Sequence, residues 1–144
     1  MYFAVPWAEP LVRYRERGFI FAYGHMLIFG PLVAMGAGLH VGAYRLEGEA
    51  TIGATATVLS VALPVALFAL TQFTLYSLLF REFDLFRFGL LAGTGTVLGG
   101  SVLLAAAGVS MGICLLVLVL APAVTVVGYE TLRHRQTADA LQQL

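Results

Sequence analysis

Two histidines in the first long apolar tract are the side chains of this sequence best suited to chemistry. His25 lies in FIFAYGHMLIFGPLV, residues 19–33, and His40 follows fifteen residues later. On a single helix they are separated by roughly 22 Å along the axis and about 60° around it. That separation excludes one metal ion or one haem bound by both imidazoles. We therefore predict no metal site and no cofactor.

The apolar tracts offer these histidines no charged partner. Proton relays and cation-coupled transporters typically need an intramembrane carboxylate or a partner charge, and no Asp, Glu, Lys or Arg lies deep in any tract. Three interpretations of His25 stay open. It anchors packing against a neighbouring helix, it contributes to a pore or relay, or it ligates haem or metal in an oligomer. His40 is interpreted as an interfacial residue.

The motifs of common catalytic sites are missing. The sequence contains no H-E-x-x-H, no C-x-x-C and no G-x-G-x-x-G before a helix, and LGGSV around Ser101 is not a Gly-x-Ser-x-Gly elbow. All eight basic residues are arginine, so a retinal Schiff base, which requires a lysine amine, is excluded. We therefore predict that the protein is not an enzyme and has no catalytic residues.

The elements that position these residues are apolar tracts long enough to cross a bilayer. Hydrophobic residues make up 60% of the chain, charged residues 11%, and the mean hydropathy is +0.90. Soluble domains carry about 25% charged residues, and a span needs about 20 apolar residues. The longest tract fits two spans, with a break predicted at AGVSMG, residues 107–112. We predict an all-α integral membrane protein, a bundle of four transmembrane helices at about 18–44, 51–80, 87–107 and 110–131.

The arginines predict the orientation of this bundle. Arg45 alone falls on one side of an alternating four-span topology, and the other seven fall on the opposite side. Because cytoplasmic loops are enriched in basic residues, both termini are predicted to be cytoplasmic. The chain then divides into an interfacial segment (1–17), a transmembrane domain (18–131) and a cytoplasmic tail (132–144). The seven arginines are Arg13, Arg15, Arg17, Arg81, Arg87, Arg133 and Arg135.

Small and weakly polar residues follow several helix faces. In membranes such residues usually mark faces where helices pack closely. Two interpretations stay open: packing within a bundle or oligomer, or a solute path lined by small polar groups. One loose face of the first span carries His25, Gly36 and His40. The other candidates are Thr71, Gln72 and Thr74 in the second span, and the G-x-x-x-G pairs Gly89–Gly93 and Gly95–Gly99 in the third.

The stretch FAYGHMLIFGPLVAMGAGLHVGAY, residues 21–44, resembles the later part of the bacterial low temperature requirement A proteins. There, an aromatic-(Ala/Gly)-Tyr-Gly-His run opens a span, and Tyr23, Gly24 and His25 match that motif. The resemblance implies a polytopic membrane protein and supplies no catalytic residues. Family members are longer, with more spans upstream. The chain therefore resembles half of such a protein: a fragment, a split gene product, or a small relative that completes itself by oligomerising.

Three hypotheses for the function follow. The first is a subunit of the bacterial inner membrane that forms an oligomer and transports a small solute or an ion. The second is a structural or assembly subunit that packs against a larger membrane partner. The third is a membrane protein that binds haem through His25. The expected partners are the lipid bilayer and either further copies of the chain or a larger membrane protein, and no nucleic acid is expected.

Overall fold

The computed structural model describes residues 18–80 and 85–142, and in these two ranges the chain forms α-helices and no strand. Each helix contains a stretch long and apolar enough to cross a membrane. The predicted all-α membrane protein with four spans is therefore confirmed. The predicted interfacial segment, 1–17, lies outside the described residues. The helices are α2 (Gly18–Glu47), α3 (Ala54–Phe80), α4 (Leu85–Ala106) and α5 (Met111–Gln142).

The helices begin and end at residues that differ from the predicted boundaries. Arg45, predicted in a loop, lies in the last turn of α2, where its guanidinium donates a hydrogen bond to the carbonyl of Ile52 at 3.0 Å. A cation is favourable there because a helix C-terminus carries partial negative charge. Helix α3 begins at Ala54, three residues later than predicted. Helix α5 continues to Gln142, because no Gly or Pro interrupts its last turns.

Two glycines end α2 and α4 in the same way. Gly48 and Gly108 have φ angles of 82° and 79°, a left-handed conformation that favours glycine. In each case the glycine amide donates to the carbonyl three residues earlier, and the next amide donates to the carbonyl five residues earlier. This is the Schellman arrangement of a helix C-terminus. The break predicted within 107–112 is therefore confirmed.

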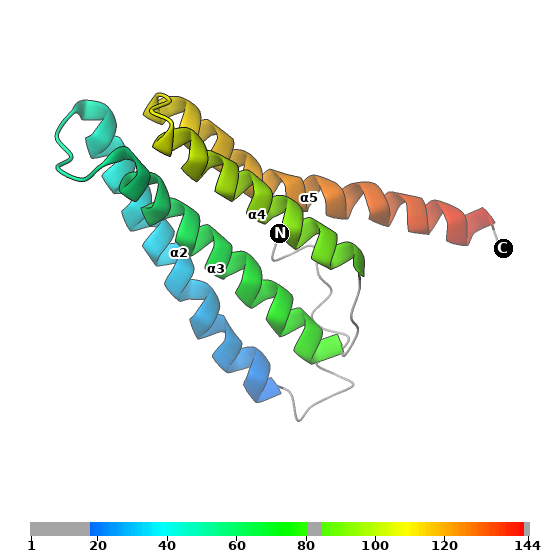
Figure 1. The fold of residues 1–144 in the computed structure, drawn as a ribbon. Coiled ribbons are helices and arrows are strands. Elements are labelled where there is room, and N and C mark those ends of the chain that lie inside the picture. Colours follow the sequence, from blue (N-terminus) through cyan, green and yellow to red (C-terminus); the bar gives the residue numbers. More distant parts are fainter. Residues whose placement is uncertain (1–17, 81–84, 143–144) are drawn as a thin grey trace.

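The helices form two antiparallel hairpins, α2–α3 and α4–α5 (Figure 1). The loop of each hairpin lies at the same end of the molecule, and the hairpins diverge toward the other end, where α5 extends beyond its neighbours (Figure 1). Helix α3 is the most enclosed. In the most apolar stretch of each helix, 44% of residues are buried in α3, against 17% in α2, 22% in α4 and 17% in α5. The hairpins therefore contact each other mainly through α3.

The buried core lies toward the end with the two hairpin loops. Most of its residues lie three, four or seven positions apart along their helix, the spacing of left-handed helix packing. The side chains that form it are small or β-branched in α3 and mixed in α4 and α5. The core residues are Val58, Val61, Ala62, Val65, Leu98, Ala105, Cys114, Leu118 and Ala121.

Hydrogen bonds join α4 to α5 within this core. The hydroxyls of Thr94 and Thr125 lie 2.8 Å apart, and the Ser101 hydroxyl donates to the carbonyl of Cys114 at 2.8 Å. Because lipid is as apolar as the side chains, helix association in a membrane depends on such bonds and on close packing. The two bonds therefore hold α4 and α5 in register.

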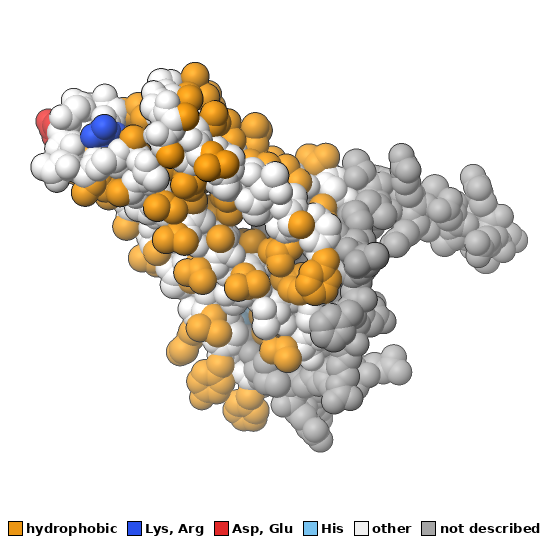
Figure 2. Space-filling view, in the orientation of Figure 1, with side chains coloured by type: hydrophobic (Ala, Val, Ile, Leu, Met, Phe, Trp, Pro, Cys, Tyr) orange, Lys and Arg blue, Asp and Glu red, His pale blue; other side chains and the backbone are white. Residues whose placement is uncertain are grey.

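The outer surface is apolar along the helices. Figure 2 shows hydrophobic side chains over the visible face of the molecule, with charged side chains at the end that carries the α2–α3 loop. Side chains such as Val33, Leu103 and Leu116 are more than two-thirds exposed. Such a surface fits a hydrocarbon environment, since soluble proteins rarely expose apolar patches of this extent.

Candidate functional site

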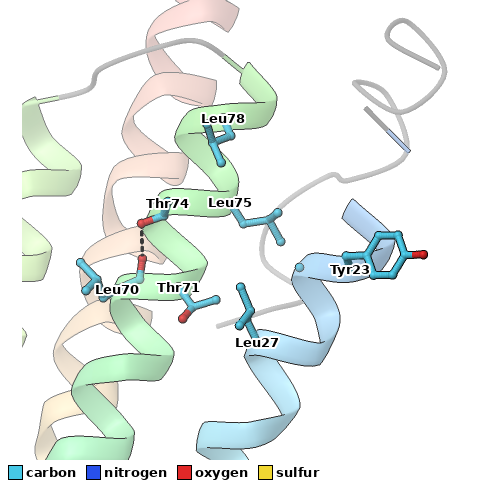
Figure 3. Close-up of a pocket in the computed structure, with 8 residues that line it drawn as sticks. Tyr23, Leu27, Leu70, Thr71, Thr74, Leu75 and Leu78 are labelled. Carbon is cyan, nitrogen blue, oxygen red and sulfur yellow. Dashed lines mark hydrogen bonds between the residues drawn. The ribbon is translucent and has the colours of Figure 1, made fainter. Parts of the chain in front are cut away.

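The groove between the start of α2 and the end of α3 brings four of the predicted candidates together (Figure 3). Its volume is about 380 Å³. Most of its leucines are about half exposed or more, so the groove opens on the outer surface of the hairpin. Its lining residues, called here the α2–α3 groove, are Tyr23, Gly24, Leu27, Leu70, Thr71, Thr74, Leu75 and Leu78.

Gly24 lets the floor of the groove form. Leu75, which is 4% exposed, is directed toward α2 (Figure 3), where its side chain lies against Gly24. A Cβ at Gly24 would lie 2.7 Å from Cδ1 of Leu75, so any larger residue would displace this leucine. The Tyr23 ring points away from the groove (Figure 3). The groove is therefore mainly apolar, with Tyr23 at its rim.

Thr71 is the groove residue whose hydroxyl is available to a ligand. The Thr74 hydroxyl donates to the carbonyl of Leu70 at 2.8 Å, and the hydroxyls of Ser60 and Ser77 also donate to carbonyls of α3. Such bonds satisfy a hydroxyl within its own helix. The Thr71 hydroxyl makes no hydrogen bond with the described part of the chain, so it can donate to a group that enters the groove.

Gln72 lies outside the groove lining, about 100° around α3 from Thr71. Its side chain is 7% exposed, and neither its Nε2 nor its Oε1 atom has a hydrogen-bond partner. Val65, seven residues earlier and thus within about 20° around the helix, belongs to the core. Gln72 therefore continues the line of α3 that faces the second hairpin, beyond the point where the core ends.

An amide without partners is costly at this position. Leaving a buried polar group unsatisfied costs about 1–3 kcal/mol. Buried polar groups in proteins are nearly always paired with a protein group, water or an ion. Gln72 is thus the predicted candidate whose buried amide can still bond to a polar group.

The two histidines do not share a site. His25 is half-buried and is not among the residues that line the groove, and its ring centroid lies 6.3 Å from that of Phe29. His40 is exposed near the other end of α2, with its ring edge-on to Tyr44 at 4.7 Å. Gly36, between them, has open space where a Cβ would stand.

The glycines predicted to pack α4 lie mostly outside the contacts of this chain. A Cβ at Gly93 would meet Val124 at 3.5 Å, but Gly89, Gly95 and Gly99 have nothing within 4 Å. Helix α4 packs instead through a ridge spaced by four, three and four residues: Thr94, Leu98, Ser101 and Ala105. Packing by the other three glycines stays a prediction about a neighbour outside this chain.

Sequence reasoning missed several residues of these contacts. Thr94 and Ser101 sit among the eight glycines and alanines of α4, and their contacts became evident only from the face that α5 covers. The leucines of the groove could not be identified from the sequence, because leucine is also the ordinary lipid-facing residue. Among the described residues, no group of three or more His, Cys, Asp or Glu could hold a metal ion.

The family model of the bacterial low temperature requirement A protein (LtrA) matches residues 1–122. The chain belongs to this family. The match extends into α5 and includes both the α2–α3 groove and Gln72, so the resemblance carried by the Tyr-Gly-His motif is confirmed. The LtrA-family chain is thus a multi-pass membrane protein. No curated protein and no solved structure matches it.

Proposed function

We propose that this LtrA-family chain is a membrane subunit that binds and passes a small, uncharged polar solute at Gln72. One observation carries the proposal: an amide that is 7% exposed, in a membrane-spanning helix, without a hydrogen-bond partner. Gln72 lies roughly 12 Å along α3 from its end at Phe80, on the side where the hairpins diverge. A solute entering from that end would reach the amide first.

The chemistry of Gln72 favours a neutral solute over an ion. An amide offers two donors and a carbonyl acceptor, so it pairs with water, alcohols or other amides. A transported ion typically needs a charged partner inside the membrane. The described charged side chains, Arg45, Glu47 and Glu49, lie at the opposite end of the α2–α3 hairpin. Within the described spans, Gln72 thus has no charge nearby to select an ion.

The test is solute flux into proteoliposomes, measured by stopped-flow light scattering with glycerol and urea gradients. Wild-type protein should carry these solutes faster than empty liposomes. Gln72→Leu should slow the flux about tenfold, because a lost hydrogen bond of about 1.4 kcal/mol corresponds to that factor. Ser77→Ala is the matched control on α3, because its hydroxyl is satisfied within the helix, and it should leave the flux unchanged.

Two results would reject this proposal. In one, wild-type liposomes conduct no more solute than empty ones. In the other, Gln72→Leu raises the unfolding temperature, as expected when an unsatisfied amide is removed, but leaves the flux unchanged. The second result would assign Gln72 to the fold and not to transport.

A second candidate function, favoured by the open glycines of α4, is that of a self-associating subunit. Gly95 and Gly99 form a G-x-x-x-G pair with no neighbour within 4 Å, and Thr96 beside them is exposed. Such pairs let two membrane helices approach closely. The occupant proposed for this face is a second copy of the chain, because 22% burial in the apolar stretch of α4 leaves most of that helix uncovered.

Size-exclusion chromatography with light scattering in mild detergent tests this association. Wild type should be an oligomer, and the double variant Gly95→Leu, Gly99→Leu should be a monomer. Gly30→Leu is the control, since Gly30 on α2 is equally open. A monomeric wild type would rule out self-association. A larger membrane protein that copurifies with wild type and not with the double variant would instead support the assembly-subunit alternative.

A further inference from the structure

We propose that the phenyl rings of Phe73 and Phe88 form one wall of the Gln72 site and set the size of the solute that reaches the amide. The two rings are called here the Phe73–Phe88 pair. This wall extends the solute path proposed above and depends on it, because it adds the residues that select one polar solute over another.

The Phe73–Phe88 pair joins the two hairpins beside Gln72. The ring centroids of Phe73 in α3 and Phe88 in α4 lie 4.8 Å apart, with an interplanar angle of 69°. This edge-to-face geometry is a favourable contact between aromatic rings. Phe73 directly follows Gln72, so the two residues differ by only about 1.5 Å in depth along α3. The hairpins are therefore in contact at the depth of the amide.

Gln72 lies between the directions of α2 and α4 around α3. Leu75 marks the direction of α2, because its side chain lies against Gly24, and Phe73 marks that of α4. Gln72 is about 60° around the helix from Leu75 and about 100° from Phe73, on the arc between them. The amide is thus flanked by a leucine on one side and by the Phe73–Phe88 pair on the other.

The exposure of these side chains places the pair between the amide and the outer surface. Phe88 is 44% exposed and Phe73 is half-buried, whereas Gln72 is 7% exposed. Phe88 is also the first residue of the apolar span of α4. The pair therefore lies at the end of the spans from which a solute is proposed to enter, with the amide on its inner side.

A wall of two phenyl rings selects a solute by its size. The rings offer no hydrogen bond, whereas the Gln72 amide can both donate and accept. The amide would thus bind hydroxyl groups, and the rings would limit the space for the carbon chain that carries them. Small-molecule sites typically combine aromatic walls with a few polar groups in this way. The arrangement favours a short polyol such as glycerol over a longer polyol such as xylitol.

The fluxes of glycerol and xylitol into proteoliposomes test this wall. The quantity compared is the ratio of the xylitol flux to the glycerol flux, because the amount of folded protein cancels in it. Phe88→Ala should raise this ratio about tenfold, since one extra carbon in a crowded site is worth at least that factor. Phe29→Ala is the matched control. Phe29 lies on α2, is 59% exposed and contacts His25, so the loss of its ring should leave the ratio unchanged.

Two further variants keep the test independent of any one substitution. Phe73→Ala removes the other ring of the pair and should raise the ratio in the same way. Phe88→Trp enlarges the ring and should slow the glycerol flux about tenfold, because it crowds the site further. A pair with only a structural role would lower the unfolding temperature of the variants and leave the ratio unchanged.

The outcomes distinguish a failure of this wall from a failure of the solute path. Suppose that wild type carries glycerol and that Gln72→Leu slows it. If Phe88→Ala and Phe73→Ala then keep the wild-type ratio, the pair is not part of the site and the proposal is overturned. If wild type carries neither solute faster than empty liposomes, the solute path is rejected and the wall with it. An equal rise of the ratio in Phe29→Ala would indicate a general leak and would also overturn the proposal.

Discussion

At the scale of single residues, the missing side chain of Gly38 sets how closely α2 and α3 pack. A Cβ at this position would contact the backbone carbonyl of Ser60, which cannot rotate away as a flexible side chain can. Gly38 is buried, whereas Gly36, two residues earlier on the same helix, has open space around it. The two positions therefore form a matched pair for testing the packing of this hairpin.

We predict that Gly38→Ala destabilises the protein and that Gly36→Ala does not. Overpacking of this kind costs about 1–3 kcal/mol, because α2 must move away from α3 over several turns. Thermal unfolding in detergent, followed by circular dichroism, measures the difference. Equal unfolding temperatures for the two variants would show that α2 and α3 are not in close contact at Ser60.

The role of each glycine was out of reach of the sequence. Gly24 and Gly38 lie at close helix contacts, but Gly30 and Gly36 of the same span are open. In a soluble helix, polarity tells the buried face from the exposed one. Here both faces are apolar, so periodicity alone cannot say which one lipid covers. The same limit hid the leucines of the groove, while Gln72 could be singled out because its amide is rare in such a tract.

At the scale of elements, the α4–α5 hairpin depends on a hydrogen bond between helices. Thr94 is 2% exposed and shares a 2.8 Å hydrogen bond with Thr125. Thr96, two residues later, is exposed, and its hydroxyl donates to the carbonyl of Ala92 in its own helix. Comparing substitutions at the two threonines therefore distinguishes the effect of an interhelical hydrogen bond from that of a hydrogen bond within one helix.

We expect Thr94→Val to lower the free energy of unfolding by about 0.6–2 kcal/mol, the range for such bonds in membranes. Thr96→Val should have little effect, because the hydroxyl that it removes is bonded only within α4. A double-mutant cycle with Thr125→Val, measured by denaturant unfolding, isolates the pair. Additive effects of the two substitutions would contradict the hydrogen bond.

The four elements themselves were predictable, and their ends less so. Long tracts without charge predicted four spans, because hydrocarbon excludes unpaired charges regardless of packing. The break at Gly108 was predictable, because a chain that turns sharply needs a residue tolerating positive φ. The predicted fourth span ended at residue 131, because the apolar stretch ends at Gly128, but the helix continues beyond it to Gln142.

At the scale of the whole molecule, the two hairpin loops lie at one end and the start of α2 lies at the other (Figure 1). Arg45 lies on the loop side, and the alternating topology predicted from the sequence assigns the other seven arginines to the opposite side. The charge bias therefore predicts that the loops face away from the cytoplasm.

Cysteine labelling in intact cells checks this orientation. A membrane-impermeant thiol reagent should label Glu49→Cys in the α2–α3 loop, and should label Gln142→Cys at the end of α5 only after the membrane is permeabilised. The native Cys114 is buried and should not react. The reverse pattern would place both termini outside the cytoplasm.

We propose that the amide of Gln72 faces a polar species between the hairpins. A cryo-electron microscopy map of the assembled protein in lipid nanodiscs, at a resolution that shows ordered water, tests it most directly. We predict density for water or a solute at about 2.7–3.2 Å from the amide of Gln72. A Gln72 amide that bonds only to protein groups, with no such density, would contradict this proposal.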